Sequence, residues 1–192
     1  MNPFDALIAA LNACRVCAEY LPLGPHPVFQ LAPTARLLIT SQAPGTKAHL
    51  AGLPFHDRSG ERLRHWLGLS EAQFYDAEKI AILPVGLCYP GRAKKGSGDA
   101  PPRPECAPLW REQLLAHLAD LQLTLLVGSH AQNLVLGAGN MTERVRNFRS
   151  FLPEYFPLPH PSWRTGHWER QNPWFAAEVL PELRAMVSAL LA

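Results

Sequence analysis

Short apolar runs alternate with amphipathic stretches along the chain. Three of these runs are rich in Leu, Ile and Val, and we interpret residues 35–40, 80–85 and 121–127 as buried strands. Residues 155–158 are a candidate for a short fourth strand. Strands that alternate with helices form parallel sheets covered on both faces, so the pattern predicts a three-layer α/β/α sandwich around a central, mainly parallel four-stranded sheet.

Capping signals predict where the helices begin. Asn2-Pro3 is typical of an N-cap followed by proline at the first helical position, and apolar residues then repeat at helical spacing as far as Leu11. The other predicted helices span residues 60–67 with Ser59 as cap, a short segment after Ser70, residues 108–118, residues 129–136, and a final stretch from Asn172-Pro173 to about residue 191.

Three loops follow the predicted strands and carry most of the unusual residues. In open parallel sheets, ligands bind in the loops beyond the carboxyl ends of the strands. That rule selects residues 41–58, 86–104 and 160–170. We therefore expect the functional site where these loops meet.

Composition and charge narrow the class of protein. The chain has 192 residues, of which 47% are hydrophobic and 18% charged, as in a globular protein, and we expect residues 1–192 to form a single domain. No apolar run is long enough to span a bilayer, and no basic, apolar leader precedes residue 35, so we expect a cytoplasmic protein. The net charge of +2 is too small to establish a nucleic-acid partner.

The four cysteines form a suggestive pattern. Cys14 and Cys17 are a C-x-x-C pair, and Cys88 and Cys106 are single and distant in sequence. Four thiolates suit either zinc or an iron–sulfur cluster. Two disulfides or buried free thiols are the alternatives, and the spacing by itself does not decide between these readings.

Several loop residues are candidates for ligand contact. Phe55 follows a proline and precedes charged residues, and it fits either the rim of a site or an ordinary core position. His160 lies between two prolines, whose stiff backbone suits a side chain directed at a ligand, and Ser162 offers a hydroxyl and an amide to a phosphate.

Taken together, these motifs resemble the uracil-DNA glycosylase superfamily, and most closely its family 4, the iron–sulfur branch of bacteria and archaea. The resemblance runs from Cys14 almost to the C-terminus. It rests on the C-x-x-C pair, a strand followed by Ser-Gln-Ala-Pro-Gly at residues 41–45, the Gly-Leu-Pro-Phe and Ser-Gly pieces of residues 52–60, the two later cysteines, His-Pro-Ser at residues 160–162, and Asn172-Pro173.

The resemblance implies a monomeric enzyme of DNA base-excision repair that flips a damaged base into a pocket and breaks its glycosidic bond. Phe55 would stack on the base, with Ala43, Gly45 and His49 also in the base pocket, and His160 would stabilise the departing base. The implied DNA contacts are Ser162, Arg164, Arg92, Lys94 and Lys95, and Trp163 or Trp168 is a candidate wedge. The four cysteines would hold a structural 4Fe-4S cluster, with zinc as the alternative.

Two positions depart from the family pattern. Gln42 stands where family 4 has a glutamate; glutamine can orient water but cannot accept its proton, so Asp57, or else His49, would have to compensate. The family has an asparagine before the third cysteine that distinguishes uracil from cytosine, whereas residues 83–87 contain no amide side chain and include Pro84. We therefore expect a divergent branch with uracil or another deaminated base as substrate.

Two alternatives remain at this stage. The altered pocket is also consistent with a binding module of the same fold that recognises damaged or single-stranded DNA without turning it over. An unrelated metal-dependent hydrolase is the weaker reading, because the histidines lack the H-x-x-x-H spacing of a metal site.

Overall fold

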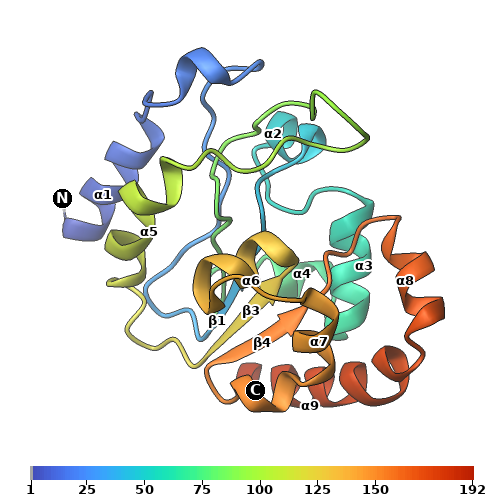
Figure 1. Ribbon diagram of the computed structural model, residues 1–192. Helices are drawn as coiled ribbons and strands as arrows, with labels where there is room; N and C mark the ends of the chain where they lie inside the picture. The colour runs from blue at the N-terminus through green and yellow to red at the C-terminus, as the bar shows by residue number, and fades with distance from the viewer. Residues whose placement is uncertain (1) are drawn as a thin grey trace.

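The computed structural model describes residues 2–192, and Met1 lies outside the described part of the chain. Within that part, one parallel sheet has the strand order β2-β1-β3-β4. The strands are β1 (Leu37–Thr40), β2 (Ile80–Ile82), β3 (Leu123–Val127) and β4 (Tyr155–Leu158). Helices lie on both sides of this sheet (Figure 1), which confirms the predicted three-layer α/β/α arrangement.

Helices precede, connect and follow the strands. The α-helices are α1 (Pro3–Asn12), α2 (Thr46–Ala51), α3 (Arg58–Leu67), α4 (Glu71–Phe74), α5 (Cys106–Leu115), α6 (Ser129–Leu136), α7 (Met141–Arg146), α8 (Thr165–Gln171) and α9 (Leu180–Leu191). Two short 3₁₀ segments, η1 (Ala18–Tyr20) and η2 (Phe148–Phe151), and one π-helical segment, η3 (Phe175–Val179), complete the described chain.

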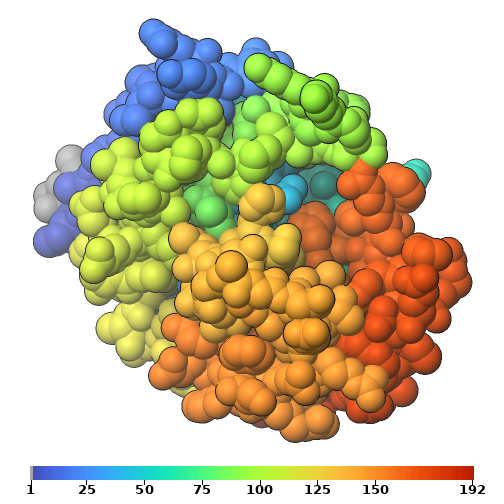
Figure 2. Space-filling model, in the orientation of Figure 1, coloured from blue at the N-terminus to red at the C-terminus, as the bar shows by residue number. Residues whose placement is uncertain are grey.

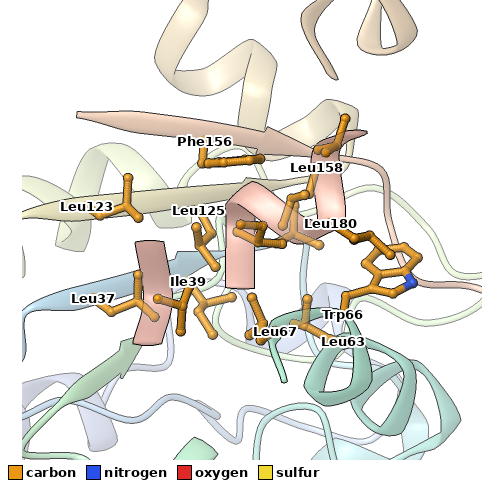
Figure 3. Close-up of a cluster of buried hydrophobic side chains, with 14 of the residues drawn as sticks. Leu37, Ile39, Leu63, Trp66, Leu67, Leu123, Leu125, Phe156, Leu158 and Leu180 are labelled. Carbon is orange, nitrogen blue, oxygen red and sulfur yellow. The ribbon is translucent and has the colours of Figure 1, made fainter. Parts of the chain in front are cut away.

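Side chains that alternate along the strands divide the core into two layers. Leu37 and Ile39 of β1 point to one face, where they belong to a cluster that includes Leu63 and Leu67 of α3 and Leu180 of α9 (Figure 3). Leu38 points to the opposite face and packs in a second cluster that includes residues of α1 and α5. Because both faces are buried, each strand is apolar on both sides, which explains the continuous apolar runs in the sequence.

The predicted helix starts are confirmed at two caps and corrected at a third. The Asn2 side chain accepts a hydrogen bond from the Asp5 amide at 2.8 Å, and Ser70 forms a capping box with Gln73. Helix α3 begins at Arg58 and is capped by Asp57, two positions before the predicted Ser59 cap. Asp57 is the cap because its carboxylate, and not the Ser59 hydroxyl, accepts the hydrogen bond from the Gly60 amide.

Other differences from the sequence prediction arise at prolines and in loops. Strand β2 ends before Pro84, which has no N–H for the ladder, although Val85 and Gly86 still donate to the carbonyls of Ser41 and Gln42 at 2.8 Å. Helices α2, α7 and α8 were not predicted, since each is six or seven residues long and lies in a segment with a weak apolar period. The final helix starts with π-helical turns before α9, where Pro181 removes a donor from the first turn.

The strand order creates a switch point at β1. The chain passes from β1 to β2 on one side and then crosses to β3 on the other, so the loops beyond β1 diverge and leave room between them. The segments after all four strands meet at this end of the sheet. No helix within residues 2–192 is long and apolar enough to cross a membrane.

Candidate active site

A cavity of about 380 Å³ opens at the carboxyl ends of the strands. Its walls come from residues 41–59 after β1, Pro84 after β2, residues 97–99 in the following loop, and residues 160–164 after β4. Figure 2 shows a hollow between the loop near residue 95 and the segment after β4, with atoms of the first loop at its floor. Geometry thus brings together the three loops that the sequence selected.

Phe55 reaches the cavity through an unusual backbone conformation. Its φ angle is +56°, the single positive value among non-glycine residues within 2–192. A Cβ built on Gly60 would lie 1.8 Å from the Phe55 carbonyl oxygen, so the first turn of α3 can approach Phe55 only because residue 60 is glycine. The ring lines the cavity and packs edge-to-face on Phe74 with centroids 6.1 Å apart. Residue packing therefore fixes an aromatic face at the cavity wall.

Asp57 has two distinct contacts, one for each carboxylate oxygen. Oδ1 accepts a hydrogen bond from the Gly60 amide at 3.0 Å and caps α3. Oδ2 lies 4.0 Å from the position that a Cβ on Gly45 would occupy, on the cavity side. The cap fixes the orientation of the carboxylate, which leaves its second oxygen available to a molecule in the cavity.

His160 is placed by the strand that precedes it and by a neighbouring glycine. The Thr165 hydroxyl donates a hydrogen bond to the His160 carbonyl. A Cβ built on Gly128, directly after β3, would lie 3.1 Å from the His160 Cβ, so glycine at that position admits the histidine. Burial lowers the pKa of His160, the Asp57 charge opposes this, and the nearby His130 lowers the pKa further. The ring is therefore neutral near pH 7 and offers one N–H donor.

A model of the Uracil DNA glycosylase superfamily matches residues 28–184 of the chain. The chain belongs to the uracil DNA glycosylase superfamily. Proteins of this superfamily are glycosylases that act on DNA, so the predicted superfamily and its glycosylase-like chemistry are confirmed at that level. Among solved structures, the chain is similar to the solution NMR structure of a candidate uracil DNA glycosylase from Methanosarcina acetivorans. The sequences are 16% identical, the TM-score is 0.49, and the match covers 86% of this chain and 99% of that one.

Most residues that the superfamily resemblance selected lie at the cavity. Gln42, Ala43 and Gly45 line it from the first loop, and Ser162 and Arg164 line it from the segment after β4. The backbone carbonyl of Gln42 is engaged by Gly86, which fixes this turn against the chain beyond β2. The side chains suggested for base, water and phosphate contact are thus neighbours, although they come from distant segments.

His49 is an exception, because it does not line the cavity. It lies on α2 and is buried, with its ring 5.0 Å from that of His26 and 6.1 Å from that of Tyr89. Burial and then the His26 charge lower the pKa of His49. His49 lies on α2, a helix that the sequence did not predict, and its ring is in packing contacts instead of the cavity lining, so its expected place in the base pocket is not seen in this cavity.

The basic residues of the second loop do not line the cavity, although residues 97–99 of the same loop do. Arg92, Lys94 and Lys95 are exposed on the loop, and none of them lines the cavity. Arg164 donates to the backbone oxygen and the hydroxyl of Ser97, which joins this loop to the segment after β4. The loop that carries these exposed positive charges is therefore in contact with the segment after β4.

The two candidate wedge residues have different environments. Trp163 is 79% exposed at the cavity mouth, with the Arg164 guanidinium 5.3 Å from its ring. Trp168 instead packs edge-to-face on Trp174 and Phe175 and donates to the Thr142 hydroxyl at 2.8 Å. Only the first of the two has a side chain free to enter DNA.

Asp99 lines the cavity but was not selected from the sequence. Its Oδ2 lies 3.4 Å from the position of a Cβ on Gly45. Burial raises the pKa of Asp99, the Arg92 charge and a hydrogen bond from Tyr89 oppose this, and the Asp57 charge raises it further. In the sequence, Asp99 is a single carboxylate that follows Gly96-Ser97-Gly98, and such glycine-rich segments most often form solvated turns, so nothing marked it as a site residue.

The four cysteines meet at a second, smaller cavity, where α1 ends and α5 begins. Cys14, Cys17, Cys88 and Cys106 all line it, and all four are free thiols. Burial raises the pKa of Cys88 and of Cys106 to about 11, and the Leu87 amide donates to the Cys106 sulfur at 3.3 Å. Within residues 2–192 no group of three metal-binding side chains is arranged to hold a single ion.

Proposed function

We propose that the protein is a monofunctional DNA glycosylase that hydrolyses the N-glycosidic bond of uracil or another deaminated base flipped out of DNA. The observation that carries this proposal is that Phe55, Asp57 and His160 line one cavity in a chain of this superfamily. The cavity lies at the sheet's switch point, where ligands bind in open parallel sheets.

Base binding and departure are assigned to two side chains. The Phe55 ring offers a fixed face on which a planar base can stack. His160 donates an N–H to an oxygen of the departing base, where negative charge develops as the bond breaks. The lowered pKa of His160 is compatible with this role, because the neutral imidazole still carries one N–H donor.

Water is placed by Gln42 and activated by Asp57. The water oxygen bonds to C1′ of the sugar while the bond from C1′ to the base nitrogen breaks, and the electron pair of that bond leaves with the base. Asp57 accepts the proton that the water loses, and the base anion takes up a proton from solvent. The free Oδ2 of Asp57 supports this division of roles, since glutamine cannot accept the proton.

DNA contacts surround the cavity. Ser162 and Arg164 at the mouth, with Arg92, Lys94 and Lys95 on the adjoining loop, are suited to phosphates on either side of a flipped nucleotide. Trp163 is suited to fill the space that the base leaves in the duplex, as apolar wedges do. The positive charges are local, which is compatible with a net charge of only +2.

A structural 4Fe-4S cluster held by the four cysteines is part of the proposal and places the chain near family 4. The convergence of all four thiols on one small cavity supports a shared inorganic group. A cluster binds each thiolate to its own iron, whereas one zinc ion binds all four sulfurs, and zinc is the alternative that the same four cysteines could hold. The group would stabilise the loop between Cys88 and Cys106 and take no part in hydrolysis.

The test is excision from oligonucleotides that carry one uracil, hypoxanthine, xanthine or mismatched thymine, single-stranded and paired, followed by alkali to cut abasic sites. Strand cleavage at one or more of these bases, lost in His160→Ala, supports the proposal. Salt-sensitive binding to these oligonucleotides without strand cleavage would instead establish a binding module of the same fold. The observation that favours this alternative is Pro84, which gives the cavity wall no amide side chain to distinguish bases.

A further inference from the structure

Two carboxylates approach the same point in the cavity. Asp57 Oδ2 lies 4.0 Å and Asp99 Oδ2 lies 3.4 Å from the position that a Cβ on Gly45 would occupy. They come from different segments, one from the cap of α3 and the other from the glycine-rich loop before Cys106. A Cβ at position 45 would therefore be in van der Waals contact with both carboxylate oxygens, which places them on the same side of the first loop.

Asp99 is held in place by its own loop. Residues 92 and 99 pair as an antiparallel bridge, with the Ala100 amide donating to Gly91 at 2.8 Å and the Ala93 amide to Gly98 at 3.1 Å. The charged and titratable groups around the carboxyl are Tyr89, Arg92, Asp57, and, at the cavity mouth, Arg164 beside Gly98 and His160. The carboxyl is therefore fixed at the wall of the cavity.

The proposed hydrolysis leaves Asp99 without a role. It also assigns no hydrogen-bonding group to the polar edge of the base. The buried wall residue at position 84 is proline, which has neither an amide side chain nor a backbone N–H. Burial raises the pKa of Asp99 above that of a solvated aspartate, and the Asp57 charge raises it further, so the cavity favours the protonated carboxyl more than water does. A protonated carboxyl offers one donor and one acceptor, the same complement as a carboxamide.

We propose that Asp99 contacts the flipped base and reads its keto and ring N–H edge, a task for which the wall residue Pro84 has no amide side chain. The inference rests on the glycosylase function proposed above. The edge in question is shared by uracil and hypoxanthine, which present a carbonyl beside an N–H. In this scheme Asp57 accepts the proton from the water, and Asp99 forms hydrogen bonds with the base.

The experiment compares Asp99→Asn, Asp99→Ala and Asp99→Ser with the wild-type protein. Binding is measured to DNA with a 2′-fluorinated deoxyuridine, whose glycosidic bond resists cleavage, and excision is measured in single turnovers. Both truncations should weaken binding and lower kcat/KM about 100-fold or more, since they leave polar atoms of the base unpaired. Asparagine should recover most of this loss, to within about tenfold of wild type, because its amide presents the same donor and acceptor.

Controls separate a base contact from a structural role. Asp120→Ala and Asp120→Asn change an exposed carboxylate just before β3, at the opposite end of the sheet, and should alter neither readout. Thermal unfolding of each Asp99 variant should stay close to that of wild type. Asp57→Asn should show the opposite pattern, with the uncleavable DNA still bound and the excision rate lost.

Three outcomes would overturn the inference. Truncations that bind and excise like wild type would show that Asp99 does not touch the base. An asparagine variant as impaired as alanine would show that an ionised carboxylate is required. If the wild-type protein excises no base at all, the proposed function itself fails, and that result is distinct because it precedes any comparison of variants.

Discussion

The carbonyl oxygen of Phe55 occupies the space that a side chain on Gly60 would need, because a Cβ there would lie 1.8 Å away. Phe55 is also the residue with a φ angle of +56°. The strained aromatic residue and the first turn of α3 are thus one unit, in which glycine permits the approach and the helix maintains the strain.

Replacing Gly60 by alanine should therefore disturb the aromatic wall of the cavity. We expect Gly60→Ala to lower the free energy of unfolding by about 1–3 kcal/mol through overpacking and to reduce excision at least tenfold. Gly166→Ala is the matched control, because this helical glycine has a normal φ and its nearest side-chain atoms are 3.9 Å from a built Cβ. Equal effects of the two changes on excision would contradict this account.

Asp57 combines a structural cap with a proposed chemical role, and two substitutions separate them. Asp57→Asn should keep the cap and the stability, since asparagine caps as well as aspartate, but slow excision by about 100-fold or more. Asp57→Ala should add a loss of about 1 kcal/mol of stability. Glu61→Gln, on the first turn of the same helix, serves as control. Full activity of Asp57→Asn would leave water placement to Gln42.

Stability should depend on the ionisation of two histidines. Burial lowers the pKa of His160 and of His49, so both stay neutral in the folded protein where the unfolded chain binds protons. Their contribution to stability is complete above an unfolded pKa of about 6.5 and is lost as the pH falls toward their folded values. Denaturant unfolding between about pH 7.5 and 5 should show a shallower decline in His160→Gln and His49→Gln, whereas exposed His167→Gln should follow wild type.

The cysteine site makes a spectroscopic prediction. Protein purified without oxygen should be coloured, with broad visible absorption and with iron and acid-labile sulfide in equal amounts. Cys88→Ser or Cys106→Ser should lower the iron content and the unfolding temperature, because both residues anchor the loop between them. Colourless protein that contains zinc would identify the other metal, and four thiols that react freely without metal loss would contradict a shared site.

Trp163 should matter for duplex DNA more than for single strands. We expect Trp163→Ala to slow excision from paired substrate about tenfold or more and to change single-stranded excision little, since only a duplex must be held open. Because the side chain is 79% exposed, thermal unfolding should not change. Trp163→Phe should retain most of the duplex activity. Equal losses on both substrates would indicate a stacking contact in place of a wedge.

The order of elements follows from local information. Apolar runs, the Asn2 cap and the Ser70 capping box are encoded within a few residues, so strands, helix starts and the layered α/β/α fold could be predicted from them. The loops after the strands were predicted as the site for the same reason, because parallel sheets always direct these loops to one edge. Short helices such as α2 and α8 escaped prediction, because tertiary contacts rather than their own sequence stabilise them.

What the tertiary structure decided is which side chains meet. The sequence identified Phe55, Asp57 and His160 as candidates, and its motifs pointed to a superfamily that the comparison confirms. It could not show that His49 on α2 packs against His26, or that the bridge between residues 92 and 99 accompanies the placement of Asp99 in the same cavity as Asp57. Those relationships depend on backbone turns and close approaches between distant segments, and no local pattern of residues records them.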